Sequence, residues 1–71
     1  MKPDEIRKVQ AFMRNAFKSP DLEVRARSNK DDSAEVFINN EFLGIVFRDE
    51  EDGELSWGFQ MAILEIDVEG L

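Results

Sequence analysis

Hydrophobic residues in the first part of the chain recur with the spacing of an amphipathic helix. Pro3 suits the first helical turn, where an N–H needs no partner, and Asp4 and Glu5 place negative charge at the positive end of the helix dipole. The pattern predicts a helix that begins near residue 3 and stops at Ser19–Asp21, because Pro20 and the residue before it disfavour helical continuation. The apolar arc of this helix contains Ile6, Val9, Phe12, Met13, Ala16 and Phe17.

Beyond this stop the hydrophobic period changes from that of a helix to that of a strand. Residues 22–27 alternate between apolar and charged side chains, and residues 34–38 show a second alternating set. Asn39–Asn40 suits a two-residue hairpin loop, because asparagine tolerates the left-handed conformation. This loop predicts a register with three facing pairs, namely Ile38 with Glu41, Val36 with Leu43, and Ala34 with Ile45.

The last third of the chain is less clearly patterned. The acidic run 49–54 predicts a turn in which Gly53 takes a positive φ. Residues 55–68 alternate as a strand does, although the spacing of Phe59, Ala62, Ile63 and Ile66 also fits a short helix. We favour a strand, because aromatic and β-branched residues dominate, with a bend or bulge near Gly58. Which face of this segment meets the helix is left open.

These elements predict one small domain covering residues 1–71. Its fold class is α+β, with one N-terminal amphipathic helix packed on a three- to four-stranded antiparallel sheet, in the order αβββ(β). A chain of this length buries only about 60% of the surface that its unfolded form exposes. Packing or a second copy of the chain must therefore supply any extra stability.

The predicted register leaves apolar side chains on the sheet face that points away from the helix. A contiguous apolar patch of this kind usually marks an interface, which predicts a non-enzymatic interaction module that binds a protein partner or forms a homodimer through the sheet. Alternatively, the last segment folds over this face and covers it. The candidate interaction residues are Phe37, Phe42, Val46, Leu64 and Ile66, the last two on condition that Trp57, Phe59 and Met61 face the helix.

The composition argues against catalysis and against bound metals. The chain contains no His, Cys, Tyr or Thr, so it lacks the commonest general base, the most reactive nucleophile and the ligands of structural zinc. The acidic run fails as a calcium loop, because Arg48 occupies the first ligand position when Gly53 is aligned with the invariant glycine. We therefore expect no enzymatic activity, no catalytic residues, no cofactor and no metal. A start without an apolar signal region, and the lack of a membrane-length apolar run, predict a cytoplasmic protein with no membrane contact.

The net charge of -7 is unevenly distributed. Residues 1–30 carry eight basic and four acidic side chains, whereas residues 31–71 carry one basic and twelve acidic ones. The alternative functional hypothesis is therefore a binder of anionic ligands or nucleic acid through the basic first part. Its weakness is the acidic remainder, which repels phosphate, so nucleic acid is not the favoured partner. The candidate residues are Arg7, Arg14, Lys18, Arg25 and Arg27.

Four stretches of the chain resemble a small proteobacterial family that is known as a domain of unknown function. They are Met1–Ile6, Lys30–Val36, Phe47–Glu50 and Phe59–Leu64. The resemblance spans nearly the whole chain, which implies that the family consists of this domain standing alone. It also implies a cytoplasmic, bacterial origin, and it brings no activity, cofactor or functional residues.

Overall fold

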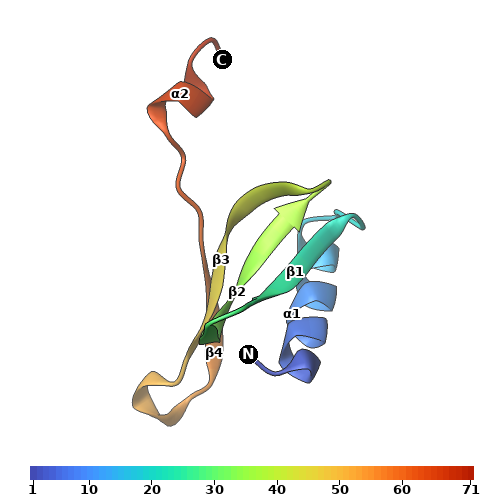
Figure 1. The fold of residues 1–71 in the computed structure, drawn as a ribbon, viewed down its shortest axis with the longest axis vertical. Coiled ribbons are helices and arrows are strands. Elements are labelled where there is room, and N and C mark those ends of the chain that lie inside the picture. The colour runs from blue at the N-terminus through green and yellow to red at the C-terminus, as the bar shows by residue number, and fades with distance from the viewer.

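The computed structural model describes residues 1–71 except for the side chain of Asp52, a residue of the acidic run, which lies outside the described part. Figure 1 shows one long helix, α1 (Pro3–Ala16), lying across an antiparallel sheet, with a short helix, α2 (Glu65–Val68), near the end of the chain. The α+β arrangement and the start of the helix at residue 3 are confirmed.

The two ends of α1 follow from local chemistry. At the first turn, the backbone amide of Lys2 donates a hydrogen bond to Glu5 Oε1 at 3.3 Å. At the other end, Lys18 takes a left-handed conformation with φ 53°, and the amide of Ser19 donates to the Arg14 carbonyl oxygen at 2.9 Å. This pattern satisfies carbonyl groups of the last turn, so the helix ends at Ala16, before the proline that was expected to stop it.

The sheet has the strand order β1-β2-β3-β4, with every neighbouring pair antiparallel. Asn39 and Asn40 both have positive φ values, 51° and 66°, as a two-residue hairpin loop between β2 and β3 requires. The predicted hairpin and its first pair, Ile38 with Glu41, are confirmed. The strands are β1 (Leu22–Arg27), β2 (Lys30–Ile38), β3 (Glu41–Asp49) and β4 (Ser56–Gln60).

The predicted register of this hairpin is wrong beyond its first pairs. A bulge shifts the pairing after Phe37 and Phe42, so that Val36 lies opposite Gly44, and Leu43 is the extra residue of β3. One extra residue reverses the alternation of inward and outward side chains in the rest of the strand. Val46 consequently faces α1 and is only 2% exposed, so its assignment to the uncovered sheet face is also wrong.

The core lies between α1 and the first three strands. Val9 and Met13 are the buried residues of the helix. Figure 1 shows α1 running beside β1, and β1 is the strand with which the helix makes its most extensive contact. The helix is thus displaced toward one edge of the sheet, while β4 forms the opposite edge. The strand residues of the core are Leu22, Val24, Ala34, Val36 and Val46.

Residues 55–68 form a strand only in part. The turn before β4 contains a short 3-10 helix, Glu51–Gly53, in which Gly53 has the expected positive φ of 75°. β4 ends at Gln60, after which the chain leaves the sheet and finishes with α2, so the strand that we favoured is correct for 56–60 and wrong beyond. Figure 1 shows this final segment, drawn in orange to red, extending away from the rest of the molecule. The segment therefore does not fold over the second sheet face.

The bend or bulge that was expected near Gly58 is absent from the β3–β4 pairing. Gly58 pairs regularly with Phe47 in the β3–β4 ladder, which shows no register shift. A Cβ atom at this position would lie 2.8 Å from the tip of the Phe47 ring. The glycine thus makes room for an aromatic ring on the sheet face opposite α1.

Candidate interaction surface

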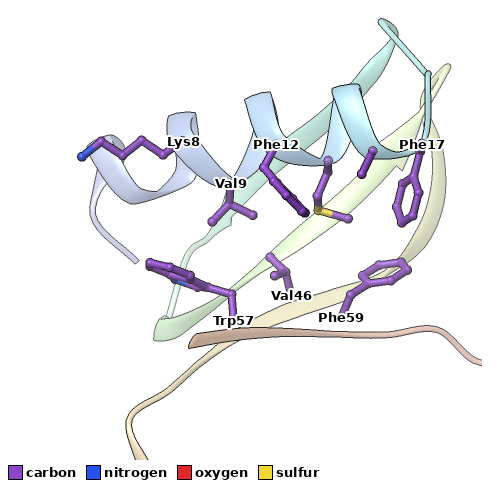
Figure 2. A pocket seen from close by; sticks show the side chains of 9 residues that line it. Lys8, Val9, Phe12, Phe17, Val46, Trp57 and Phe59 are labelled. Atoms are coloured by element: carbon purple, nitrogen blue, oxygen red, sulfur yellow. The ribbon is translucent and has the colours of Figure 1, made fainter. Parts of the chain in front are cut away.

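An apolar groove lies between α1 and β4, where the displaced helix leaves the sheet partly uncovered. Its volume is about 450 Å³, in the range of about 300–1,000 Å³ found for small-molecule pockets. Figure 2 shows Val46 at the centre of its floor, Phe12 projecting from the helix, and Trp57 at one end. The lining residues are Lys8, Val9, Phe12, Met13, Ala16, Phe17, Val46, Trp57 and Phe59.

Two contacts to β4 hold the ends of this groove, one from α1 and one from Phe17, the residue directly after α1. At one end, the indole Nε1 of Trp57 donates a hydrogen bond to Glu5 Oε2 at 3.1 Å. At the other end, the rings of Phe17 and Phe59 lie tilted, with their centroids 6.2 Å apart. Between these contacts the aromatic side chains remain accessible, since Phe12 is 71% exposed and Trp57 is 39% exposed. Large apolar side chains therefore line an open groove instead of completing the core.

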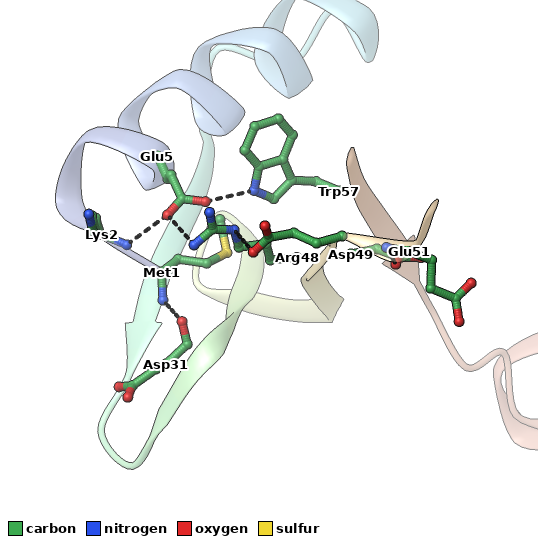
Figure 3. A network of polar contacts seen from close by, with 9 residues as sticks. Met1, Lys2, Glu5, Asp31, Arg48, Asp49, Glu51 and Trp57 are labelled. Atoms are coloured by element: carbon green, nitrogen blue, oxygen red, sulfur yellow. Dashed lines mark hydrogen bonds and ion pairs between the residues drawn. The ribbon is translucent and has the colours of Figure 1, made fainter. Parts of the chain in front are cut away.

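Polar contacts surround Glu5 at the tryptophan end of the groove (Figure 3). Arg48 Nη1 lies 3.5 Å from Glu5 Oε1, and Arg48 Nε lies 3.3 Å from Glu50 Oε1 without the geometry of a hydrogen bond. The first strand hairpin joins this region too, because the N-terminal ammonium donates to the carbonyl oxygen of Asp31. The groove end is thus held by side chains that are distant in the sequence.

The environment of Glu5 lowers the pKa of its carboxyl group below the ordinary value of 4.5. Desolvation by burial acts in the opposite direction and raises the pKa. The hydrogen bonds from the Lys2 amide and the Trp57 indole outweigh it, with help from the positive charges of Arg48 and the N-terminus. The carboxylate form of Glu5 is accordingly the form that joins α1 to β4.

The segment 61–71 carries a second set of uncovered apolar side chains. It extends from the end of β4, and its α2 turn has no buried residue. The most exposed member within α2 is Ile66, at 71%. Of the predicted interaction residues, Leu64 and Ile66 lie here, remote from the sheet face on which they were expected. The exposed apolar residues of the segment are Met61, Ile63, Leu64, Ile66, Val68 and Leu71.

The sheet face opposite α1 holds the remaining predicted interaction residues, Phe37 and Phe42. Their rings meet edge to face with centroids 5.7 Å apart, and the guanidinium carbon of Arg25 lies 4.0 Å from the centroid of the Phe37 ring. Phe42 is 51% exposed, whereas Phe37 is half-buried beneath the arginine. Part of this aromatic patch is therefore covered by a cation that packs on it.

The basic residues of the alternative hypothesis fall into two groups. Three belong to α1 and the turn after it, where the Nε of Arg14 donates to the Leu22 carbonyl oxygen at 2.7 Å. The other two belong to β1, where Arg25 donates to Asn40 Oδ1 at 2.7 Å and Arg27 donates to Ser33 Oγ at 3.0 Å. Because Leu22 and Val24 alternate with Arg25 and Arg27 and face the helix, these two arginines lie on the other side of the sheet. The structure does not bring the five residues together.

Sequence reasoning did not identify the groove, although it named most of its lining. Phe12 and Phe17 belong to the predicted apolar arc of the helix, and Trp57 and Phe59 were the β4 residues considered to face it. The hydrophobic pattern does not indicate that α1 is displaced toward β1. The available signal was the number of large apolar side chains on the arc, since Phe12 and Phe17 remain exposed beside the buried Val9 and Met13.

Within the described part of the chain, no three carboxylates gather in a way that could hold a metal ion. Neither described helix has the length and apolar character needed to cross a bilayer.

Comparison with known proteins gives a family and no activity. Neither the curated proteins nor the solved structures contain a match to this chain. A family model described as "Protein of unknown function (DUF3126)" matches residues 5–67 of the 71 residues, which includes most of α1, the whole sheet and most of α2. The match covers nearly the entire chain and confirms the expected resemblance to a small family of unknown function. The chain is therefore a member of the DUF3126 family.

Proposed function

We propose that this domain is a non-enzymatic protein–protein interaction module that forms a homodimer. The observation that carries this proposal is the open apolar groove between α1 and β4, flanked by a segment whose apolar side chains are also exposed. A small monomeric protein seldom leaves contiguous apolar surface of this size in water. Covering it with a second chain removes the apolar area from solvent and stabilises the domain.

The size of the exposed surface supports an interface. A stable protein–protein interface buries about 800 Å² on each partner. The groove provides part of this area, since Phe12 is 71% exposed, whereas Trp57 and Phe59 keep only 39% and 36% of their surface exposed. Segment 61–71 adds six exposed apolar side chains to this surface.

Sedimentation equilibrium of the purified chain tests this proposal. The expected result is a species with twice the mass of the 8.2 kDa chain, which dissociates on dilution. Raising the salt concentration should weaken the dimer only modestly, because burial of apolar area is the main driving force. A mass of one chain at every concentration would refute the proposal.

A further inference from the structure

We infer that segment 61–71 of one copy docks into the groove between α1 and β4 of a second copy. This inference rests on the proposed function, since it specifies how the homodimer is built. The groove and the segment both carry apolar side chains that the rest of the chain leaves exposed. Shape, charge and the direction of the chain each favour this pairing.

The groove fits aliphatic side chains better than it fits a complete helix. It is about 450 Å³ in volume, with aromatic rings at both ends and Val46 as its floor. The segment offers aliphatic residues on an extended stretch, 61–64, followed by the single helical turn α2. An extended chain with a short turn can insert several aliphatic side chains in succession into such a groove.

Charge favours the same pairing. Segment 61–71 contains Glu65, Asp67 and Glu69 and no basic residue. The helix that forms one wall of the groove contributes one basic residue, Lys8, to its lining. Arg14 instead donates to the Leu22 carbonyl oxygen of β1, and it lies with Lys18 on the side of the helix away from the groove. An acidic side chain of the segment that flanks the apolar contacts would meet Lys8 on the rim, which favours one orientation of the docked segment.

The direction of the chain favours a second copy over the same copy. At the end of β4 the chain passes over Gly44, where a Cβ atom would overlap the Gln60 carbonyl oxygen and lie 3.1 Å from Met61 Cα. The backbone is thus packed tightly at the point where it leaves the sheet, beside the Phe17–Phe59 end of the groove. From there it extends away (Figure 1), and it would have to reverse at once to enter its own groove.

A twofold axis between two copies allows both segments to dock reciprocally. Each segment then fills the groove of its neighbour, and the two contacts are identical, as in most homodimers. Exchange of this kind buries both apolar surfaces with no change to the core of either domain. It also places Trp57 under the partner's segment.

Three single substitutions separate this inference from other dimers. Ile66→Asp alters the segment, Phe12→Asp alters the groove, and Phe42→Asp is the matched control on the opposite sheet face. All three positions are at least half-exposed, so each chain should fold, and the thermal midpoint by circular dichroism verifies this. We expect Ile66→Asp and Phe12→Asp to weaken dimerisation at least about tenfold, because each removes one buried apolar side chain. Phe42→Asp should dimerise as the wild type does.

Mixing the two defective chains provides the decisive result. A mixed dimer of Ile66→Asp and Phe12→Asp chains contains one intact contact and one contact with both changes. Because a contact already broken by one aspartate loses little more from a second, the mixed dimer should form at concentrations at which neither variant dimerises alone. Failure of the mixture to form dimer would overturn the exchange.

The remaining outcomes distinguish the inference from the proposed function. If the Ile66→Asp chain still dimerises, the inference is refuted, although the proposed homodimer is not. If only Phe42→Asp abolishes the dimer, the dimer interface lies on the opposite sheet face. A wild-type chain that is monomeric throughout refutes both.

Discussion

Trp57 Nε1 donates a hydrogen bond to Glu5 Oε2 at 3.1 Å, which joins the edge strand β4 to the first turn of α1 across 52 positions of sequence. Arg48 and the Lys2 amide approach the same carboxylate. These contacts hold one end of the groove. They also make a single acidic side chain responsible for part of the attachment of β4 to the helix.

The lowered pKa of Glu5 makes this attachment dependent on pH. A carboxyl group whose folded pKa lies below its unfolded value of about 4.5 stabilises the fold above that pH, and this stability is lost as the pH falls through the folded pKa. We therefore expect the stability advantage of the wild type over Glu5→Gln to be full above pH 4.5 and to shrink below it.

Urea unfolding at a series of pH values checks this prediction. Glu41→Gln, which removes an exposed carboxylate at the start of β3, is the control for the loss of one negative charge. A constant difference between wild type and Glu5→Gln across the acidic range would contradict the assignment.

The position of Val46 in the core gives a second prediction. Val46→Ala should lower the free energy of unfolding by about 1–3 kcal/mol, because it leaves a cavity beneath the helix. Phe42→Asp should change it by less than about 1 kcal/mol, because that side chain is half-exposed on the opposite face. Chemical unfolding of both variants checks the register, and a larger loss for Phe42→Asp would show that the bulge is misplaced.

Val46 also shows where prediction from the sequence stops. The helix start, the turn at Asn39–Asn40 and the first pair of the hairpin depend on local chemistry, and all three were predicted correctly. The bulge places Gly44 opposite Val36, where a Cβ atom would overlap the carbonyl oxygen of Gln60. Gln60 belongs to the end of β4, so the residues next to Gly44 in the sequence do not indicate this contact.

The groove escaped prediction for a related reason. Hydrophobic periodicity indicates which sides of α1 and β4 are apolar, and both were identified from the pattern. It does not indicate how far the helix is displaced across the sheet, since that depends on packing volumes at Val9, Met13 and the strands beneath them. Residues 61–68 were predicted to lie in the sheet because their alternation continues that of β4.

Gly44 and Gly58 allow a matched comparison of two glycines. In Gly44→Ala the new methyl group meets the backbone of Gln60, which cannot move without disturbing the β3–β4 ladder. We expect a loss of about 1–3 kcal/mol of unfolding free energy. Gly58→Ala meets the ring of Phe47, a partly exposed side chain that can turn away, so its loss should be smaller. Thermal unfolding of the two variants measures which is less stable. A greater loss of stability in Gly58→Ala than in Gly44→Ala would contradict the close packing of the chain at Gln60 over Gly44.

Lys18 offers a stabilising substitution. Its φ of 53° places a residue with a Cβ in the left-handed region, which costs about 1–2 kcal/mol relative to the usual conformation. Lys18→Gly relieves this cost, but glycine also has a greater chain entropy in the unfolded state, which opposes part of the gain. The substitution should therefore raise the unfolding free energy by about 0.5–1 kcal/mol. Lys8→Gly, within the helix, should lower it by about 1 kcal/mol. Equal destabilisation by both substitutions would exclude a left-handed Lys18.

Trp57 is the single tryptophan of the chain, and it lines the groove, so its fluorescence reports directly on whether a second copy covers that surface. The emission maximum of the wild type, measured over a range of protein concentrations, should shift to shorter wavelength as the chain associates and should return to longer wavelength on dilution. An emission maximum that does not change with concentration, while sedimentation records a change in mass, would contradict docking at the groove.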